Sequence, residues 1–319
     1  MRIYHAHDDE INPRFVIRKR NGRRRRRHNR QISRRQASSR LFTAVYVIAT
    51  RSKWFCDRFD ESLKAIWSRG DPLVSKETID VLRANHIDGK FSDAQFHQTS
   101  QETFKVISSE DIFGRWRKEK GKISCAVVGS SDNMIGSNYG SLIDSHDVII
   151  RMNVAPTKGY EKDVGTKTTF QSLYGSITKA YIRPNKILII PTSRREVNFA
   201  RLAQSRLSVN QSDVYLIHPD LYRQTKEKWM QWTEGKQRRL TTGMTILSFA
   251  VHVCNKVNVF GFGQNKAGEY KHYYSVEESR SIRKPGAKPE SAHNMKSEAD
   301  TRQKMADEGI ITVYPGVIR

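Results

Sequence analysis

Short apolar segments alternate with segments of helical periodicity through the second half of the chain, and this alternation constrains the fold more than any other feature. Five segments of four to six residues are typical of buried strands: Ser124–Val128, Asp147–Met152, Lys186–Ile190, Val214–Ile217 and Val257–Phe260. Between the last two, Tyr222–Trp232 and Met244–Cys254 carry apolar residues at helical spacing. Strands of this length alternating with helices predict an α/β fold, a single Rossmann-like domain with a mostly parallel sheet flanked by helices.

The N-terminal region differs in composition from the rest of the chain. Residues 1–40 hold 14 Lys or Arg against 3 Asp or Glu, including the run Arg23–Arg27, and contain few apolar residues. Such a segment buries too little surface to offset its ordering entropy. We therefore predict a basic, disordered tail at residues 1–53 and a single globular domain at residues 54–319, which opens with helical spacing in Trp54–Ser68.

Three roles are open for this tail. Its charge suits nucleic acid or anionic lipid, its Arg- and Ser-rich composition suits a targeting segment, and its position suits the cytoplasmic flank of a signal anchor. The apolar stretch that would form such an anchor, Leu41–Thr50, is ten residues long. A helix needs roughly 20 residues to span a bilayer, so only a degenerate anchor is compatible with it, and a polytopic membrane protein is excluded.

The cysteine count leaves two readings. Cys56, Cys125 and Cys254 are too few for a disulfide scaffold and include no CxxC pair. A secretory chain would hold one bridge and one leftover thiol, whereas a cytosolic chain would keep all three reduced.

Two glycine- and hydroxyl-rich stretches are candidates for anion binding. After the strand at 124–128, the segment 129–140 has the small residues of a strand-to-helix turn, but it matches neither GxGxxG nor the P-loop. In the second stretch, Thr241 and Thr242 precede an apolar helix, with Gly243 just inside it. Each segment suits either an ordinary turn or cap, or a site where backbone N–H groups and the helix dipole receive an anion.

Two histidines in polar sequence, His272 and His293, are candidates for proton transfer because an imidazole titrates near neutrality. The alternative is that both are solvated surface residues. A zinc site is not indicated, because the chain has no HExxH motif and no second His–Cys cluster. It also has no DxD pair of the kind that clamps a metal-bound sugar nucleotide.

Taken together, these stretches resemble the sialylmotifs of the animal-type sialyltransferases, glycosyltransferase family 29. Residues 125–169 (CAVVGSSDNMIGSNYGSLIDSHDVIIRMNVAPTKGYEKDVGTKTT) resemble the large motif, and residues 239–263 the small motif. Residues 272–275 resemble motif III, and His293 with Glu298 the very small motif. The sequences SHDVIIRMN and WFCDRFD are most similar to the β-galactoside α-2,3 branch.

The resemblance implies a GT-A-like fold and an inverting transfer of sialic acid from CMP-sialic acid to a hydroxyl of a galactose-terminated glycan. It implies no metal cofactor and no nucleic-acid partner. The chain departs from the family pattern at three positions. Ser130 stands where the family usually has Asn, and Ser275 stands where it usually has an acid or an amide. Thr241 replaces the usual Ser. These departures keep two alternatives open: a different CMP-activated keto-sugar such as Kdo, or a homologue that binds glycan or nucleotide without turnover.

The resemblance also assigns roles to individual residues. His293 is implied as the general base and His272 as the partner of the departing phosphate. Supporting roles fall to Glu298 and Tyr273. The remaining positions are implied as contacts to the donor: Ser130, Ser131, Asn153, Thr241, Thr242, Gly243 and Gly263.

A disulfide and a compartment follow from the same resemblance. Cys125 and Cys254 stand at the two cysteines that the family joins, which favours the oxidising Golgi lumen in a type II orientation and leaves Cys56 as a buried thiol. The N-terminus would then provide the membrane association. The single sequon, at Asn210, agrees with a glycoprotein.

Overall fold

The computed structural model describes residues 105–108, 110–173, 185–190, 209–230, 239–265, 270–274 and 293–317. The expected tail at 1–53, the helix expected at Trp54–Ser68, Cys56 and Ser275 lie outside these residues. The boundary expected between residues 53 and 54 therefore stays a prediction.

The described strands form one parallel sheet in the order β5-β4-β3-β2-β1-β6-β7. Their bounds are Ser124–Val128 (β1), Val148–Met152 (β2), Phe170–Leu173 (β3), Lys186–Ile189 (β4), Val214–Leu216 (β5), Lys256–Phe260 (β6) and Thr312–Tyr314 (β7). From β1 to β5 the sheet grows in one direction, and β6 then returns to the other side of β1. This arrangement confirms the Rossmann-like expectation, and it creates a switch point between β1 and its neighbours, where ligands bind in open α/β sheets.

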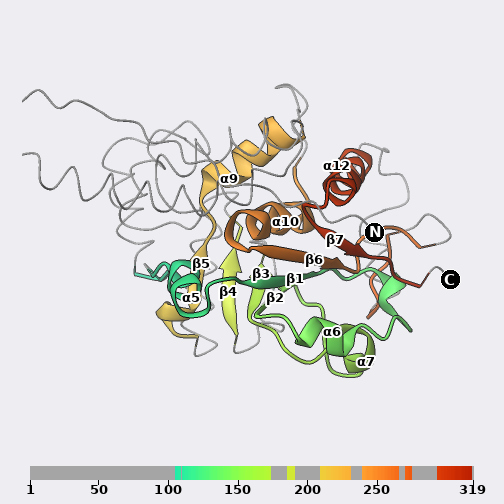
Figure 1. Ribbon diagram of the computed structural model, residues 1–319, viewed down its shortest axis with the longest axis horizontal. Coiled ribbons are helices and arrows are strands. Elements are labelled where there is room, and N and C mark those ends of the chain that lie inside the picture. The colour runs from blue at the N-terminus through green and yellow to red at the C-terminus, as the bar shows by residue number, and fades with distance from the viewer. Residues whose placement is uncertain are drawn as a thin grey trace, which may run out of the picture. The chain divides into compact units, whose positions relative to one another are not determined.

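Helices cover both faces of the sheet. Those described are α5 (Ile112–Lys120), α6 (Gly140–Asp144), α7 (Glu161–Val164), α9 (Pro219–Gln224), α10 (Thr242–Val253) and α12 (Met295–Asp307), with short 3-10 turns at Asp132–Met134 and Gln211–Asp213. Figure 1 shows α10 and α12 on one side of the sheet and α6 and α7 on the other. Right-handed crossovers require this division, because the chain adds strands in opposite directions in its two halves.

The face under α10 holds a large part of the core. All residues of α10 from Met244 to Val253 are buried, which explains why its sequence is apolar on every side. Phe249 from α10 lies 5.4 Å from Phe113 of α5, and Phe113 stacks on Phe170 of β3 at 5.6 Å between ring centroids. Phe113 thus connects Phe249 in the middle of α10 to β3.

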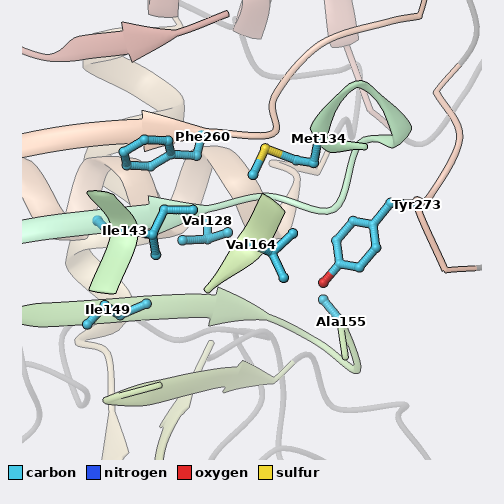
Figure 2. Close-up of a cluster of buried hydrophobic side chains, with 9 residues drawn as sticks. Val128, Met134, Ile143, Ile149, Ala155, Val164, Phe260 and Tyr273 are labelled. Carbon is cyan, nitrogen blue, oxygen red and sulfur yellow. The ribbon is translucent and has the colours of Figure 1, made fainter. Parts of the chain in front are cut away.

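The opposite face holds a second cluster, which reaches the loops at the ends of the strands (Figure 2). Val128 and Phe260 contribute from β1 and β6, and Val164 from α7. Met134 and Tyr273 join the same cluster from the turn after β1 and from the segment 270–274. This packing ties two loops that bear expected site residues to the rigid sheet.

A disulfide joins Cys125 in β1 to Cys254, the residue that ends α10, with a Cα–Cα distance of 6.1 Å. The pairing implied by the family resemblance is thus confirmed. It connects the central strand directly to the helix that precedes β6.

The sequence analysis was wrong in some details of the elements. The single helix expected at Tyr222–Trp232 is divided between α9 and a five-residue π-helix at Thr225–Trp229, and Trp232 lies outside the described residues. Two strands, β3 and β7, were not expected. Within the described part of the chain, no helix is long and apolar enough to cross a membrane.

Candidate active site

The predicted site residues gather at one edge of the sheet. In a parallel α/β fold, the carboxyl ends of the strands and the N-termini of the helices lie at the same edge of the sheet. Five segments therefore meet there: Gly129–Asp132 after β1, Asn153 after β2, Gly261–Gly263 after β6, Thr241–Gly243 at the start of α10, and His293–Asn294 at the start of α12.

The turn after β1 is held by the segment that carries His272. Ser131 and His272 form an isolated antiparallel bridge. On either side of it, the Asp132 N–H donates to the Lys271 carbonyl at 2.9 Å and the Tyr273 N–H donates to the Ser130 carbonyl at 3.0 Å. His272 is thus fixed beside the end of the central strand, next to the two serines expected to contact the donor.

Glycines allow the ends of β1 and β6 to lie unusually close together. A Cβ on Gly129 would stand 2.2 Å from the Gly261 carbonyl oxygen, and a Cβ on Gly243 would stand 2.8 Å from the ring of Phe262. Gly261 and Gly263 have φ angles of 66° and 116°, which side chains rarely adopt. Phe262 therefore sits directly against the first turn of α10, a contact that sequence reasoning did not identify.

Thr241 caps α10, as the sequence predicted, but its hydroxyl is fully engaged. Its Oγ1 accepts from the Met244 N–H at 3.0 Å and donates to Glu298 Oε2 at 2.5 Å, while the Thr241 N–H donates to Glu298 Oε1 at 2.9 Å. While Glu298 is ionised, this hydroxyl has no proton to give an anion. The structure shows Thr241 as the cap of α10, and its expected contact to the donor stays a prediction. The remaining anion-binding groups here are the first-turn N–H groups of Thr242 and Gly243.

His293 lies just before α12, whose N-cap is Asn294. Its Nδ1 lies 2.8 Å from the carbonyl oxygen of Arg239, two residues before Thr241. Because a carbonyl only accepts, Nδ1 carries the proton, and Nε2 is the basic nitrogen of the neutral ring. The side chain is partly exposed, so this nitrogen can meet a substrate hydroxyl.

Glu298 is buried, with 4% of its surface exposed. Burial raises its pKa, whereas the hydrogen bonds from Thr241 and the charges of His293 and Arg302 act to lower it. His293 and Glu298 do not share a helix face, because His293 precedes the helix. They converge instead on residues 239–241, so the start of α12 is fixed against the start of α10.

Asn153 and Tyr273 play different parts. Asn153 adopts a left-handed conformation (φ 52°), and its side-chain Oδ1 is buried without a hydrogen-bond partner among the described residues. That oxygen can accept a hydrogen bond from a bound molecule. The Tyr273 hydroxyl instead donates to the Pro156 carbonyl at 2.5 Å and its ring packs on Tyr160, so Tyr273 supports the His272 segment.

The comparison with known families decides the identity. The sequence profile of glycosyltransferase family 29 (sialyltransferase) matches residues 73–188 and 186–310. The chain belongs to this family. The resemblance drawn from the motifs is confirmed, and the protein is a glycosyltransferase of the kind that uses CMP-sialic acid as its donor.

This sialyltransferase is similar to enzymes of the α-2,3 branch. CMP-N-acetylneuraminate-beta-galactosamide-alpha-2,3-sialyltransferase 2 of Rattus norvegicus is 32% identical over 283 residues, covering 84% of this chain and 77% of the relative. CMP-N-acetylneuraminate-beta-galactosamide-alpha-2,3-sialyltransferase 1 of Homo sapiens is 27% identical over 290 residues, covering 86% of this chain and 82% of the relative. A crystal structure of a mammalian sialyltransferase in complex with Gal-beta-1-3GalNAc-ortho-nitrophenol matches with a TM-score of 0.65 at 25% identity, covering 83% of this chain and 95% of the other.

No group of three or more His, Cys, Asp or Glu side chains is arranged to hold a metal ion among the residues that the structure describes. The first turn of α10 and His272 lie at the same edge of the sheet as the turn after β1. Both can carry positive charge, the helix end through its dipole and the imidazole when it is protonated.

Proposed function

We propose that this sialyltransferase transfers sialic acid from CMP-sialic acid to the 3-hydroxyl of a galactose-terminated glycan, with inversion at the anomeric carbon. The observation that carries the proposal is the pairing of His293 with the start of α10. His293 is bonded to Arg239 and the helix start to Glu298, so a base and an anion-binding turn are held in one unit. The α-2,3 linkage is proposed from the relatives that carry that name.

In the proposed reaction the acceptor oxygen attacks the anomeric carbon from the face opposite to CMP. His293 Nε2 takes the hydroxyl proton as the new C–O bond forms, because a sugar hydroxyl is a poor nucleophile until that proton is removed. The bond between the anomeric carbon and the phosphate oxygen breaks, and CMP leaves with the electron pair. His272 and the N–H groups of Thr242 and Gly243 then stabilise the phosphate charge.

The donor would lie across the ends of β1 and β2. Ser130 and Ser131 follow β1, and Asn153, whose buried Oδ1 can accept a hydrogen bond, follows β2. Gly263 leaves the end of β6 open to close approach by a ligand. Because these groups supply the charge and polarity that the phosphate needs, we expect turnover to continue in the presence of EDTA.

A transfer assay tests the proposed function. The full chain is incubated with CMP-sialic acid and a panel that includes Galβ1-3GalNAc and Galβ1-4GlcNAc, and the product linkage is determined by mass spectrometry and NMR. We expect an α-2,3 product on at least one galactoside. Binding of CMP-sialic acid without transfer to any acceptor would support the non-catalytic alternative, and preferential use of CMP-Kdo would support a different donor.

We also propose that the protein works in the Golgi lumen, in a type II orientation and associated with the membrane through its N-terminal segment. Two described features support an oxidising, glycosylating compartment: the Cys125–Cys254 bridge and the exposure of Asn210 in its sequon. Microscopy with a Golgi marker, together with an endoglycosidase shift that Asn210→Gln abolishes, tests this location. A cytosolic signal without a mobility shift would contradict it.

A further inference from the structure

Helix α12 presents two charged side chains toward the active site. Glu298 and Arg302 are four residues apart, so they lie on the same face of the helix. Glu298 bonds to the cap of α10. One turn later, the Arg302 guanidinium carbon lies 5.5 Å from the centroid of the Phe262 ring, within the range of a cation–π contact.

Phe262 connects Arg302 to the anion-binding edge. It is the residue between Gly261 and Gly263 at the end of β6, and its ring would be 3.0 Å from a Cβ on Gly129 and 2.8 Å from a Cβ on Gly243. The ring therefore fills the space that these two glycines leave open. Arg302 covers that ring, so Arg302 reaches the ends of β1, β6 and α10 through a single aromatic side chain.

The groups around Glu298 come from the start of α10, from α12 and the residues before it, and from the segment after β6. Thr241 at the start of α10 donates two hydrogen bonds to it, His293 faces it from the residues before α12, and Arg302 faces it from α12 itself. Tyr270, after β6, faces Arg302 and Glu298. Burial raises the pKa of Glu298 and lowers that of Arg302, and the attraction between them opposes both shifts. Glu298 must be ionised to accept both bonds from Thr241, so a nearby cation favours the arrangement.

We propose that Arg302 is a positioning residue for transfer, which holds α12 and its leading residue His293 in register with the start of α10 by covering Phe262 and balancing the charge of Glu298. The proposal rests on the assignment of His293 as the base in the proposed function. Lysine would supply the charge but not a planar group that stacks on the ring. Arginine meets both requirements.

A double-mutant cycle tests this proposal, with Arg302→Met, His293→Ala and the double variant compared with the wild type. Arg302→Met keeps the length and apolar character of the side chain but removes its charge. We expect kcat to fall by roughly 10- to 100-fold, as for a displaced catalytic group, while the Kd for CMP changes little. In the His293→Ala background the same substitution should have almost no further effect on kcat, because the group that it positions is gone.

Equal losses of kcat in both backgrounds would overturn the proposal, since a general structural defect would act without regard to His293. An unchanged kcat in Arg302→Met would overturn it as well. Full activity in His293→Ala alone would instead show that the proposed function assigns the wrong base. Arg302→Lys should recover only part of kcat. Lys296→Met, on the same helix with 84% of its side chain exposed, is the matched control and should behave as wild type.

Thermal melts at pH 5 and pH 8 provide a readout that does not need turnover. Without Arg302, the pKa of Glu298 rises further, so keeping it buried costs more stability as pH increases. Arg302→Met should melt at a lower temperature than wild type. We expect this difference in melting temperature to be about 2–4 °C larger at pH 8 than at pH 5. The added variant Glu298→Gln should remove this pH dependence. A gap between wild type and Arg302→Met that is equal at both pH values would refute the charge balance.

Discussion

At the scale of single residues, the hydroxyl of Thr241 makes two hydrogen bonds, one as acceptor and one as donor. It accepts from Met244 and donates to Glu298, so it links the first turn of α10 to a carboxylate from another helix. The same atom closes a helix end and fixes the start of α12. The family resemblance also places Thr241 among the donor contacts, and that role stays a prediction.

Thr241→Val should therefore act mainly on stability. It keeps the shape of the side chain but removes the cap and leaves Glu298 Oε2 without its donor. We expect a loss of about 1–3 kcal/mol in the free energy of unfolding, measured by urea denaturation. Thr241→Ser, which retains the hydroxyl, is the control. A loss as large in the serine variant would mean that the methyl group, and not the hydrogen bonds, stabilises this site.

His293→Ala should lower turnover by roughly 10²–10⁴-fold, the range for loss of a general base, with CMP affinity nearly unchanged. Steady-state kinetics and calorimetry with CMP measure the two quantities. If a folded variant that still binds CMP loses less than about tenfold in turnover, His293 is not the base.

His272→Ala should reduce both turnover and CMP affinity, because the proposed partner of His272 is the phosphate. The same two measurements apply, and cytidine, which lacks the phosphate, provides the comparison. We expect the substitution to weaken CMP binding and to leave cytidine binding largely unchanged. Equal weakening of both ligands would place His272 away from the phosphate.

At the scale of elements, α10 is buried from Met244 to Val253 and has a histidine within that stretch. Burial lowers the pKa of His252 to about 4, even though its Nδ1 lies 2.7 Å from the Ser248 carbonyl, a bond that favours the protonated ring. The unfolded chain takes up the proton near pH 6.5, whereas the folded chain does so only near pH 4. Folding stability is therefore lost as pH falls through this window.

His252→Gln should flatten that dependence. From the displaced pKa, we expect wild type to lose roughly 2 kcal/mol of stability between pH 6.5 and 5 on account of this residue, with the glutamine variant losing correspondingly less. Denaturant titrations at the two pH values measure the difference. Glu298 acts in the opposite direction, because a raised carboxyl pKa adds stability at low pH. A steeper acid dependence in the variant would contradict the prediction.

The strands that the sequence predicts are those whose burial on both faces is matched by a run of apolar residues. β1, β2 and β6 are buried on both faces and contain the short apolar runs that parallel strands require. β3 is equally buried, but its Gln171 and Ser172 bond to the carbonyls of Asn153 and Arg151, so its sequence shows no apolar run. β7 is a three-residue edge strand with partly exposed side chains.

The site was predictable as segments but not as contacts. Small residues after a strand and hydroxyls before a helix indicate anion binding wherever they occur. The partner of such a group depends on tertiary packing, and nothing in the spacing from His293 to Glu298 shows that the helix begins at Met295. The sequence analysis did not identify Phe262 and Arg302 for the same reason. Phe262 matters because it packs against two glycines, and Arg302 because it faces a buried carboxylate, and neither neighbour is evident from the sequence.

At the scale of the whole molecule, the bridge between Cys125 and Cys254 spans 129 residues. A loop of this length should stabilise the fold by on the order of 5 kcal/mol in the chain-entropy description. We expect the melting temperature to drop markedly in dithiothreitol and a Cys125→Ala/Cys254→Ala variant to match the reduced protein. Non-reducing peptide mapping of protein from a secretory host should find one cystine. Free thiols at both positions in active enzyme would contradict this.

The same bridge changes what a protease can do to the enzyme. Any single cut between residues 129 and 241 leaves two fragments that remain one covalent molecule, with β1 on one fragment and α10 on the other. The central strand and this helix are then still tethered. A nicked preparation would run at full mass on a non-reducing gel and separate only after reduction. Such nicking would be invisible to any assay that keeps the bridge intact.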